Sequence, residues 1–210
     1  MQPPTKAFSQ ACENNKRFIL ERIENEFRAG NVVLEIGSRT AQHVIFFAQN
    51  MPLVHWIPTD IPENMGTLIE CLDGHQCDNI APPEPLNVTQ RDWPVSAANP
   101  SRPEAGVDGV FTANTLHIMP LSAVECFFAG VGRMLRPGGK LCVYGPFKYG
   151  GEFTTPSNAQ FDASLRSQNA GSGMRDFEYM TELASAQGMR LVADHAMPAN
   201  NQLLIWRMHG

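Results

Sequence analysis

The chain lacks the long apolar runs, the surplus of positive charge and the export signal that would assign it to a membrane, a nucleic acid or secretion. No apolar run in its 210 residues approaches the roughly 20 residues that a membrane-spanning helix needs. The N-terminal segment Met-Gln-Pro-Pro-Thr-Lys contains no apolar signal core. The net charge of −5 leaves no basic surplus, which nucleic-acid-binding domains normally have. We therefore expect a cytoplasmic protein that binds neither membranes nor nucleic acids.

Cysteine is scarce, and its pattern is not that of a disulfide framework. The five cysteines are odd in number and scattered, which is typical of reduced thiols. Cys71, His75 and Cys77 lie close enough in sequence to raise the possibility of a zinc site. A structural zinc site needs four ligands, and no second ligand pair accompanies these three residues. Helix-end and loop positions explain them better, and we expect no metal.

What the chain does contain is typical of a globular domain. Apolar residues make up 43% of the sequence and charged residues 18%, a balance that favours a folded protein over a disordered one. The length suits one domain with a substantial core. There is no internal repeat and no low-complexity tract. We expect a single domain over residues 1–210.

The most informative stretch is Asn31–His43. Val32–Ile36 is a short apolar run typical of a strand that is buried on both faces of a parallel sheet. Gly37 ends this run, and a helical pattern follows from about Thr40. A strand, a glycine turn and a helix place backbone N–H groups where they bind the polar part of a nucleotide-like ligand. Taken alone, the stretch fits a plain strand-to-helix turn equally well.

The rest of the chain alternates strands and helices. Apolar periodicity predicts helices over Phe8–Arg28, Glu63–Leu72, Ser122–Leu135 and Asp176–Gln187, and strands over His55–Thr59, Leu86–Val88, Val107–Thr112 and Lys140–Tyr144. The last two strands, Met189–His195 and Leu203–Arg207, are joined by a segment too short for a crossover helix. They must therefore pair as an antiparallel hairpin.

Polar residues stand where these strands end. Asp60 follows the second strand, about 20 residues after Gly37, where an acidic residue accepts hydrogen bonds from ribose hydroxyls. Its alternative role is a helix N-cap. Asn114 and His117 follow a later strand, and His117 is either a base or orienting group or a loop histidine bonded to backbone. Asn15, in the apolar stripe of the first helix, either faces a ligand or is a solvated boundary residue.

The segment 148–173 is the least regular part of the sequence. Asn158, Asp162 and Arg166 share one helical face within it, and glycines flank the polar stretch. One interpretation is a surface helix with a weak Asp–Arg pair. The other is a lid over the edge of the sheet, with the glycines as hinges.

Five strand–helix units and a terminal hairpin resemble the Rossmann-like S-adenosylmethionine (SAM) methyltransferases. Val33–Ser38 looks like their first motif, and Leu135–Lys140 like the turn before their fifth strand. Further blocks resemble an uncharacterised methyltransferase-like family within that superfamily: Ala11–Lys16, Gln42-His43, Tyr144–Phe147, Ser157–Arg166, Arg175-Asp176 and Met197–Asn201.

The resemblance implies an α/β fold with a mostly parallel seven-stranded sheet, an antiparallel C-terminal hairpin and helices on both faces. It implies SAM as cofactor, with the loop after the first strand on the methionine part, Asp60 on the ribose and Asn87-Val88 on the adenine. The implied cofactor-binding residues are Asn15, Glu35, Gly37, Ser38, Arg39, Thr40, His43, Asp60, Asn87, Val88 and Asn114. His117 and Asn114 are the catalytic candidates, and the substrate-side candidates are Asn158, Asp162, Arg166, Arg175, Asn200 and Asn201.

Two features depart from the family's usual pattern. Arg39 and Ala41 stand where the first motif usually has glycine, and Asn87 stands where the family usually has aspartate. We expect a SAM-dependent methyltransferase that acts on a small molecule, as a monomer or homodimer. One alternative is a weakly catalytic or non-catalytic binding module with a degenerate glycine loop. A second is a protein or nucleic-acid methyltransferase, which the acidic charge and the lack of a second recognition domain disfavour.

Overall fold

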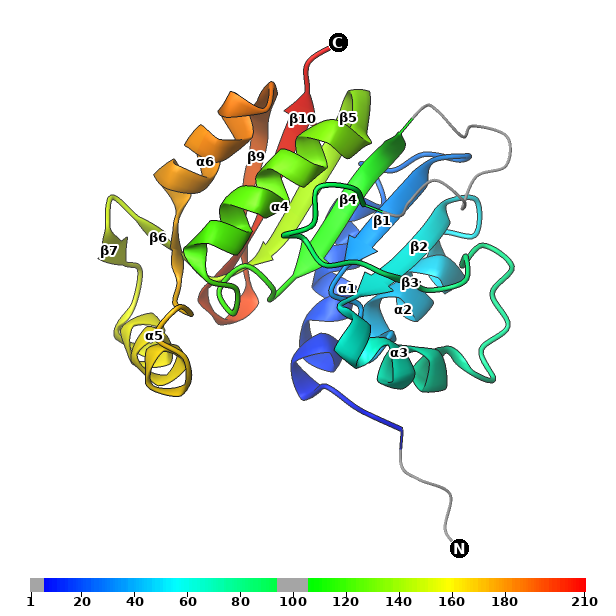
Figure 1. The fold of residues 1–210 in the computed structure, drawn as a ribbon, viewed down its shortest axis with the longest axis horizontal. Helices are drawn as coiled ribbons and strands as arrows, with labels where there is room; N and C mark the ends of the chain where they lie inside the picture. The colour runs from blue at the N-terminus through cyan, green and yellow to red at the C-terminus, as the bar shows by residue number, and fades with distance from the viewer. Residues whose placement is uncertain (1–5, 94–105) are drawn as a thin grey trace, which may run out of the picture.

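A seven-stranded sheet forms the centre of the computed structural model, which describes residues 6–93 and 106–210 (Figure 1). The strands lie in the order β3-β2-β1-β4-β5-β10-β9. The first five strands in this order are parallel, and β10 runs antiparallel to both of its neighbours. The strands are β1 Val32–Ile36, β2 His55–Asp60, β3 Glu84–Pro85, β4 Val107–Ala113, β5 Leu135–Gly145, β9 Met189–Met197 and β10 Asn201–Met208.

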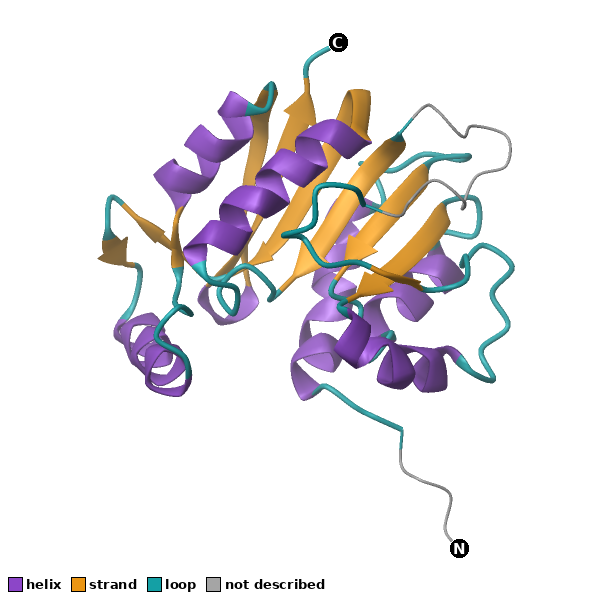
Figure 2. Cartoon of the chain, viewed as in Figure 1, coloured by secondary structure: helices purple, strands orange, loops and turns teal. Residues whose placement is uncertain are grey.

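Helices cover both faces of this sheet (Figure 2). On one face lie α1 (Gln10–Ile23), α2 (Gln42–Asn50) and α3 (Met65–Leu72), which contribute Ile19, Phe47 and Leu68 to a common core. On the other face α4 (Leu121–Met134) and α6 (Phe177–Ala186) contribute Phe127, Phe128 and Met180. Within the described ranges, no helix is both long enough and apolar enough to cross a membrane.

The position of β1 explains its sequence. It pairs with β2 on one side and β4 on the other, and all five of its residues are buried. A strand that is covered on both faces needs apolar side chains in both directions, and β1 is apolar at every position except Glu35. The predicted α/β fold, with its mostly parallel seven-stranded sheet, is confirmed.

The predicted terminal hairpin is also confirmed. β9 and β10 pair antiparallel, with Leu204 opposite Asp194, and the short 3₁₀ turn η2 (Pro198–Asn200) joins them. On its other side β10 pairs antiparallel with β5, with Leu204 opposite Val143. Because the connection is too short to cross the sheet, β10 turns back directly beside β9. β10 therefore lies between β5 and β9, and β9 forms the edge of the sheet.

The segment 148–173 is more regular than its sequence indicates. β6 (Phe147–Tyr149) pairs with β7 (Glu152–Phe153) through a turn in which Gly150 and Gly151 take φ values of 57° and 80°. β6 also pairs with β8 (Arg175–Asp176), so a small three-stranded sheet forms. The helix α5 (Pro156–Gln168) follows β7, and Figure 1 places it beyond one end of the main sheet. Strands this short leave no periodic signal, which is why the sequence pattern missed them.

Three predicted elements differ from the structure, and one of them is β5, which was expected over Lys140–Tyr144 but begins already at Leu135. The strand expected at Leu86–Val88 is not formed, because the side chain of Asn87 accepts hydrogen bonds from the backbone N and the hydroxyl of Thr89, and this local turn ends the extended chain. The helix expected over Phe8–Arg28 begins only after Ser9, whose hydroxyl caps it, and ends at Ile23 in a turn.

Candidate functional site

The loop after β1 lies at the carboxyl edge of the parallel strands and is tied to β2. The N–H groups of Gly37 and Ser38 donate to the carbonyl of Thr59 at 3.0 and 2.9 Å. The N–H of Arg39 donates to Oδ2 of Asp60 at 2.8 Å. The structure therefore brings Gly37, Ser38, Arg39 and Asp60, all predicted to bind the cofactor, to one edge of the sheet.

The backbone of this loop keeps a glycine-type conformation although two of its glycines are replaced. Gly37 has φ 81°, and the φ values of Arg39 and Ala41 are also positive, at 33° and 56°. Non-glycine residues rarely occupy this region, because Cβ approaches the carbonyl oxygen. A Cβ atom on Gly37 would also lie 3.0 Å from the hydroxyl of Thr115. The rest of the fold thus imposes the loop conformation on Arg39 and Ala41.

The carboxylate of Asp60 is buried, and most of its hydrogen-bond acceptor positions are used within the protein. Besides the N–H of Arg39 on Oδ2, its Oδ1 accepts from the N–H of Ile61 at 2.8 Å and from the Asn64 amide at 2.7 Å. A carboxylate offers about four acceptor positions, so about one remains free on Oδ2. Asp60 does not cap the following 3₁₀ turn η1 (Pro62–Asn64), whose N-cap residue is Ile61. The ribose role stays a prediction, and the N-cap alternative loses its support.

Glu35 lies beneath the loop and is 2% exposed. Its Oε2 accepts a hydrogen bond of 2.6 Å from the hydroxyl of Ser38. Burial raises the pKa of Glu35 to about 7, although the Ser38 hydrogen bond works in the opposite direction, and the nearby Asp60 charge adds to the rise. Glu35 is therefore a buried acid that changes charge near neutral pH, directly under the predicted cofactor loop.

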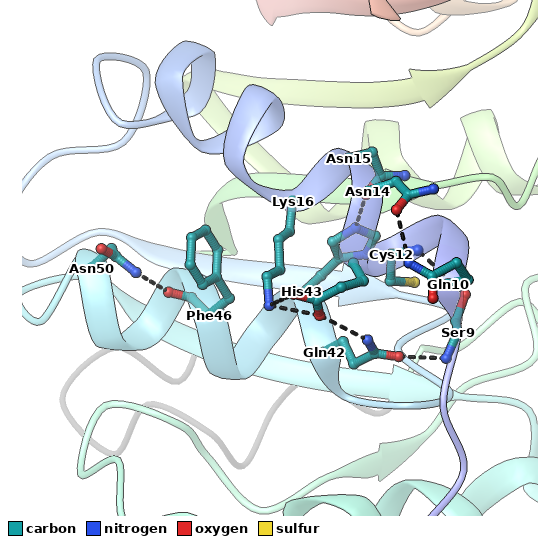
Figure 3. Close-up of polar contacts among 11 residues, drawn as sticks. Ser9, Gln10, Cys12, Asn14, Asn15, Lys16, Gln42, His43, Phe46 and Asn50 are labelled. Atoms are coloured by element: carbon teal, nitrogen blue, oxygen red, sulfur yellow. Dashed lines mark hydrogen bonds and ion pairs between the residues drawn. The ribbon is translucent and has the colours of Figure 1, made fainter. Parts of the chain in front are cut away.

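Asn15 and His43 belong to a buried network between α1 and α2 (Figure 3). Nε2 of His43 lies 2.7 Å from Oδ1 of Asn15. Since an amide oxygen only accepts, Nε2 carries the proton. Burial, with the charge of Lys16, lowers the pKa of His43 to about 4, so the ring is neutral. Asn15 and Tyr144 also line the same cavity.

A cavity of about 600 Å³ lies beyond the ends of β4 and β5, between α1 and α5. Its wall brings together Asn15, Asn114, His117, Asn158, Asn200 and Asn201 from the predicted set. Sequence reasoning missed the other lining residues: Ala11, Asn14, Tyr144, Pro146, Ser157, Phe161, Pro198 and Ala199. The signal that could have found Tyr144 is its place at the end of β5, since ligands of open α/β sheets bind at the carboxyl ends of strands.

His117 is a buried, neutral imidazole in the wall of this cavity. Burial lowers its pKa to about 4, and the positive charge of Arg175 adds to the effect. Its ring meets the edge of Phe161 at a centroid distance of 5.2 Å. Within residues 6–93 and 106–210, no side chain or backbone group hydrogen-bonds its ring nitrogens. The alternative of a loop histidine bonded to backbone through its ring therefore finds no support.

The charged residues predicted on the substrate side lie next to the cavity rather than in its wall. Asp162 and Arg166 form an ion pair of 2.7 Å on α5. The guanidinium of Arg175 donates to the carbonyls of Leu116, Met119 and Gly171. Arg175 thus fixes the loop that carries His117, and a direct substrate contact by these three charged residues stays a prediction.

Of the eleven predicted cofactor residues, all of them in the described ranges, Asn15 and Asn114 line the cavity and the other nine do not. Thr40 is buried and lines a separate hollow of about 320 Å³ beside α2. Asn87 is engaged in its turn with Thr89, and Val88 is buried in the core. Cys71 and His75 line the same hollow as Thr40, and among the described residues no three His, Cys, Asp or Glu side chains are grouped to hold a metal ion.

Comparison with known proteins places the chain in a family. The family model described as "Protein of unknown function (DUF938)" matches residues 6–208. The chain belongs to the DUF938 family. The chain thus belongs to an uncharacterised family, as its sequence blocks indicated, and its fold is that of methyltransferases.

Solved methyltransferases share this fold with the DUF938 chain at low identity. An O-methyltransferase family protein from Burkholderia thailandensis superposes with a TM-score of 0.76 at 12% identity, over 95% of this chain and 59% of the other. Human N-acetylserotonin methyltransferase, in complex with SAM, gives 0.76 at 14% identity, over 96% and 53%. The mitomycin 7-O-methyltransferase MmcR gives 0.76 at 13%, over 94% and 54%. The chain spans little more than half the length of each.

Proposed function

We propose that this DUF938 chain is a SAM-dependent methyltransferase that methylates a small molecule held in the 600 Å³ cavity. One observation carries the proposal: the cofactor-type loop packs through Gly37 against Thr115, which lies in the chain between the cavity residues Asn114 and His117, and the imidazole of His117 is neutral. The proteins that share the fold, among them one solved with SAM, support the same kind of chemistry.

The residues at the edge of the sheet suit SAM. Asp60 keeps about one acceptor position for a ribose hydroxyl, and Glu35 gains negative charge when a cation binds above it. The loop already has its glycine-type backbone, because Arg39 and Ala41 both take positive φ. The methionine part would lie at this loop, and Asn87 and Val88 would line the adenine. A weakly catalytic or non-catalytic binding module stays the alternative, because Arg39 and Asn87 stand where the family usually has glycine and aspartate.

In this proposal the cofactor supplies an electrophilic methyl group on a sulfonium. The side chains of the cavity would hold and orient the acceptor, and such positioning would provide most of the rate enhancement. His117 would accept the proton that leaves the acceptor. Its imidazole is neutral at pH 7 and so has a free lone pair, but the lowered pKa makes it a weak base, which favours an orienting role beside the proton-accepting one. Asn114, beside it, orients the acceptor.

Calorimetric titration with SAM and S-adenosylhomocysteine tests the proposal. We expect binding of both, and Asp60→Ala should weaken it by about 10- to 100-fold, because a hydrogen bond to a charged group contributes about 1.5–3 kcal/mol. Asp78→Ala, which removes an exposed carboxylate, is the matched control and should bind like the parent. An absence of SAM binding by the folded parent protein would refute the proposal.

A further inference from the structure

The wall of the 600 Å³ cavity carries no ionised group. Its fourteen residues include six asparagines, a serine, a tyrosine and a histidine, and the others are apolar. The histidine, His117, is neutral at pH 7 because burial disfavours its charged form. None of the described lining residues therefore offers a counter-charge to a bound ion.

Two charged side chains beside the cavity, Asp162 and Arg175, already have their partners within the protein. Asp162 accepts from Arg166 and, through Oδ1, from the N–H of Met174 at 2.7 Å. Arg175 is held by three backbone carbonyls behind the His117 loop. Recruiting either charge for a ligand would break contacts that fix α5 and this loop. A carboxylate, phosphate or ammonium group entering the cavity would lose hydration without gaining an ion pair, which is costly.

The cavity does offer neutral hydrogen-bonding groups and flat apolar walls. The hydroxyl of Tyr144 and the amide of Asn15 both line this space and can donate to or accept from a neutral ligand. The amides of Asn14, Asn114 and the residues of η2 surround the same space. Phe161, 40% exposed on α5, presents its ring to it.

We propose that this cavity takes an uncharged, hydroxylated ring compound as methyl acceptor and rejects acids and amines of the same size. The inference rests on the proposed methyltransferase function and deepens it by naming the substrate class. A hydroxyl on such a ring meets His117 as proton acceptor, the ring packs against Phe161, and amide groups bond its other polar atoms. In the transfer, the acceptor oxygen forms a bond to the methyl carbon, the bond from that carbon to the cofactor sulfur breaks with its electron pair going to sulfur, and the hydroxyl proton goes to His117.

The test compares three probes that share a phenol and differ in one charge: 4-hydroxybenzamide, 4-hydroxybenzoate and 4-hydroxybenzylamine. Binding is measured by ligand-observed NMR, with and without saturating S-adenosylhomocysteine. We expect the amide to bind at least tenfold more tightly than either charged probe. Phe161→Ala should weaken that binding at least fivefold, whereas Phe153→Ala, an exposed phenylalanine on β7, should not.

A charge placed in the wall gives the reciprocal test. Ser157 lines the cavity in the first turn of α5, where a carboxylate is tolerated by the helix dipole. Ser157→Asp should shift the preference toward the amine at least tenfold, and the neutral Ser157→Asn should not.

Each result decides the matter. If the parent protein binds a charged probe as tightly as the amide or more tightly, the inference is overturned. If it binds none of the three probes, the inference is also overturned, because it requires a cavity that is open to them. If Phe161→Ala leaves the binding of the amide probe unchanged, the probe binds outside the cavity, and this result overturns the inference too. Calorimetry with S-adenosylhomocysteine reports separately on the proposed function, so a protein that binds the cofactor yet prefers charged probes refutes only the substrate class.

Discussion

Nε2 of His43 lies 2.7 Å from Oδ1 of Asn15, and this contact joins α2, which begins at the cofactor loop, to α1, which forms a wall of the cavity (Figure 3). A second contact supports the first, because Oε1 of Gln42 accepts from the N–H of Ser9 at 2.6 Å. The two predicted sites therefore share a rigid boundary. Asn15 serves both, since its side chain fixes the tautomer of His43 and also lines the cavity.

Removing the amide of Asn15 should destabilise the protein. In Asn15→Leu the buried Nε2–H of His43 loses its acceptor, and an unsatisfied buried donor costs about 1–3 kcal/mol of unfolding free energy. Urea denaturation at pH 7 measures the loss. Asn14→Leu is the matched control, because this neighbour is exposed, and it should change stability by less than about 0.5 kcal/mol. Equal losses in the two variants would show that the His43 contact contributes nothing.

The lowered pKa of His43 predicts acid lability. The unfolded chain binds a proton at this residue below about pH 6.5, whereas the folded protein binds one only near pH 4, so stability falls as the pH drops through this window. From pH 7 to 4.5 the expected loss from this residue is about 2 kcal/mol. Urea denaturation at pH 7 and pH 4.5 should show that His43→Gln loses less unfolding free energy than the parent, by that amount. The glutamine amide of this variant still donates to Asn15. Parallel pH profiles of parent and variant would contradict the assignment.

Glu35 has the opposite pH dependence. Its pKa is about 7 in the folded protein and near 4.5 when unfolded, so stability falls as the pH rises through this window, where only the unfolded chain has lost the proton. Glu35→Gln keeps an acceptor for Ser38 without the charge, and relative to the parent it should gain about 2 kcal/mol between pH 5 and pH 8. Thermal or urea denaturation across this range measures it. A constant difference between the two proteins would show that Glu35 does not titrate near pH 7.

Arg39→Gly should stabilise the fold. Arg39 has φ 33°, and its backbone strain is part of the folding free energy. Relief of about 1–2 kcal/mol is partly offset by the about 0.5–1 kcal/mol of backbone entropy that glycine loses on folding, which leaves a gain of up to about 1 kcal/mol. The control Arg17→Gly, within α1, should lose about 1 kcal/mol. Chemical denaturation compares the two, and a loss in Arg39→Gly would mean that its side chain stabilises the loop.

The segment 148–173 should open more readily than the sheet. The buried side chains of α5 are the polar Asn158 and Asp162, whereas all five residues of β1 are buried and four of them are apolar. Regions that bury little apolar surface open at low free energy. Hydrogen exchange should therefore be at least 100-fold faster in α5 than in β1, and slower in α5 once S-adenosylhomocysteine and a bound acceptor are present. Protection of α5 equal to that of β1 in the free protein would rule out a lid.

Local patterns in the sequence determined the main sheet. The apolar run of β1, the glycine that ends it, and the short link between β9 and β10 each act through neighbouring residues, so they can be read without coordinates. The same holds for Asp60, Asn114 and His117, which follow strands whose ends meet at one edge. The family resemblance rests on blocks of this kind.

Tertiary structure decided the rest, because it depends on residues far apart in the chain. Tyr144 and Phe161 face one cavity only because α5 is placed by the small β6–β7–β8 sheet, whose strands are too short to give a pattern. Arg175 looks like a substrate contact in sequence, but three carbonyls from two loops engage it. The positive φ of Arg39 comes from the packing around the loop and not from arginine itself. Sequence set which side chains are available, and burial set their charge and their partners.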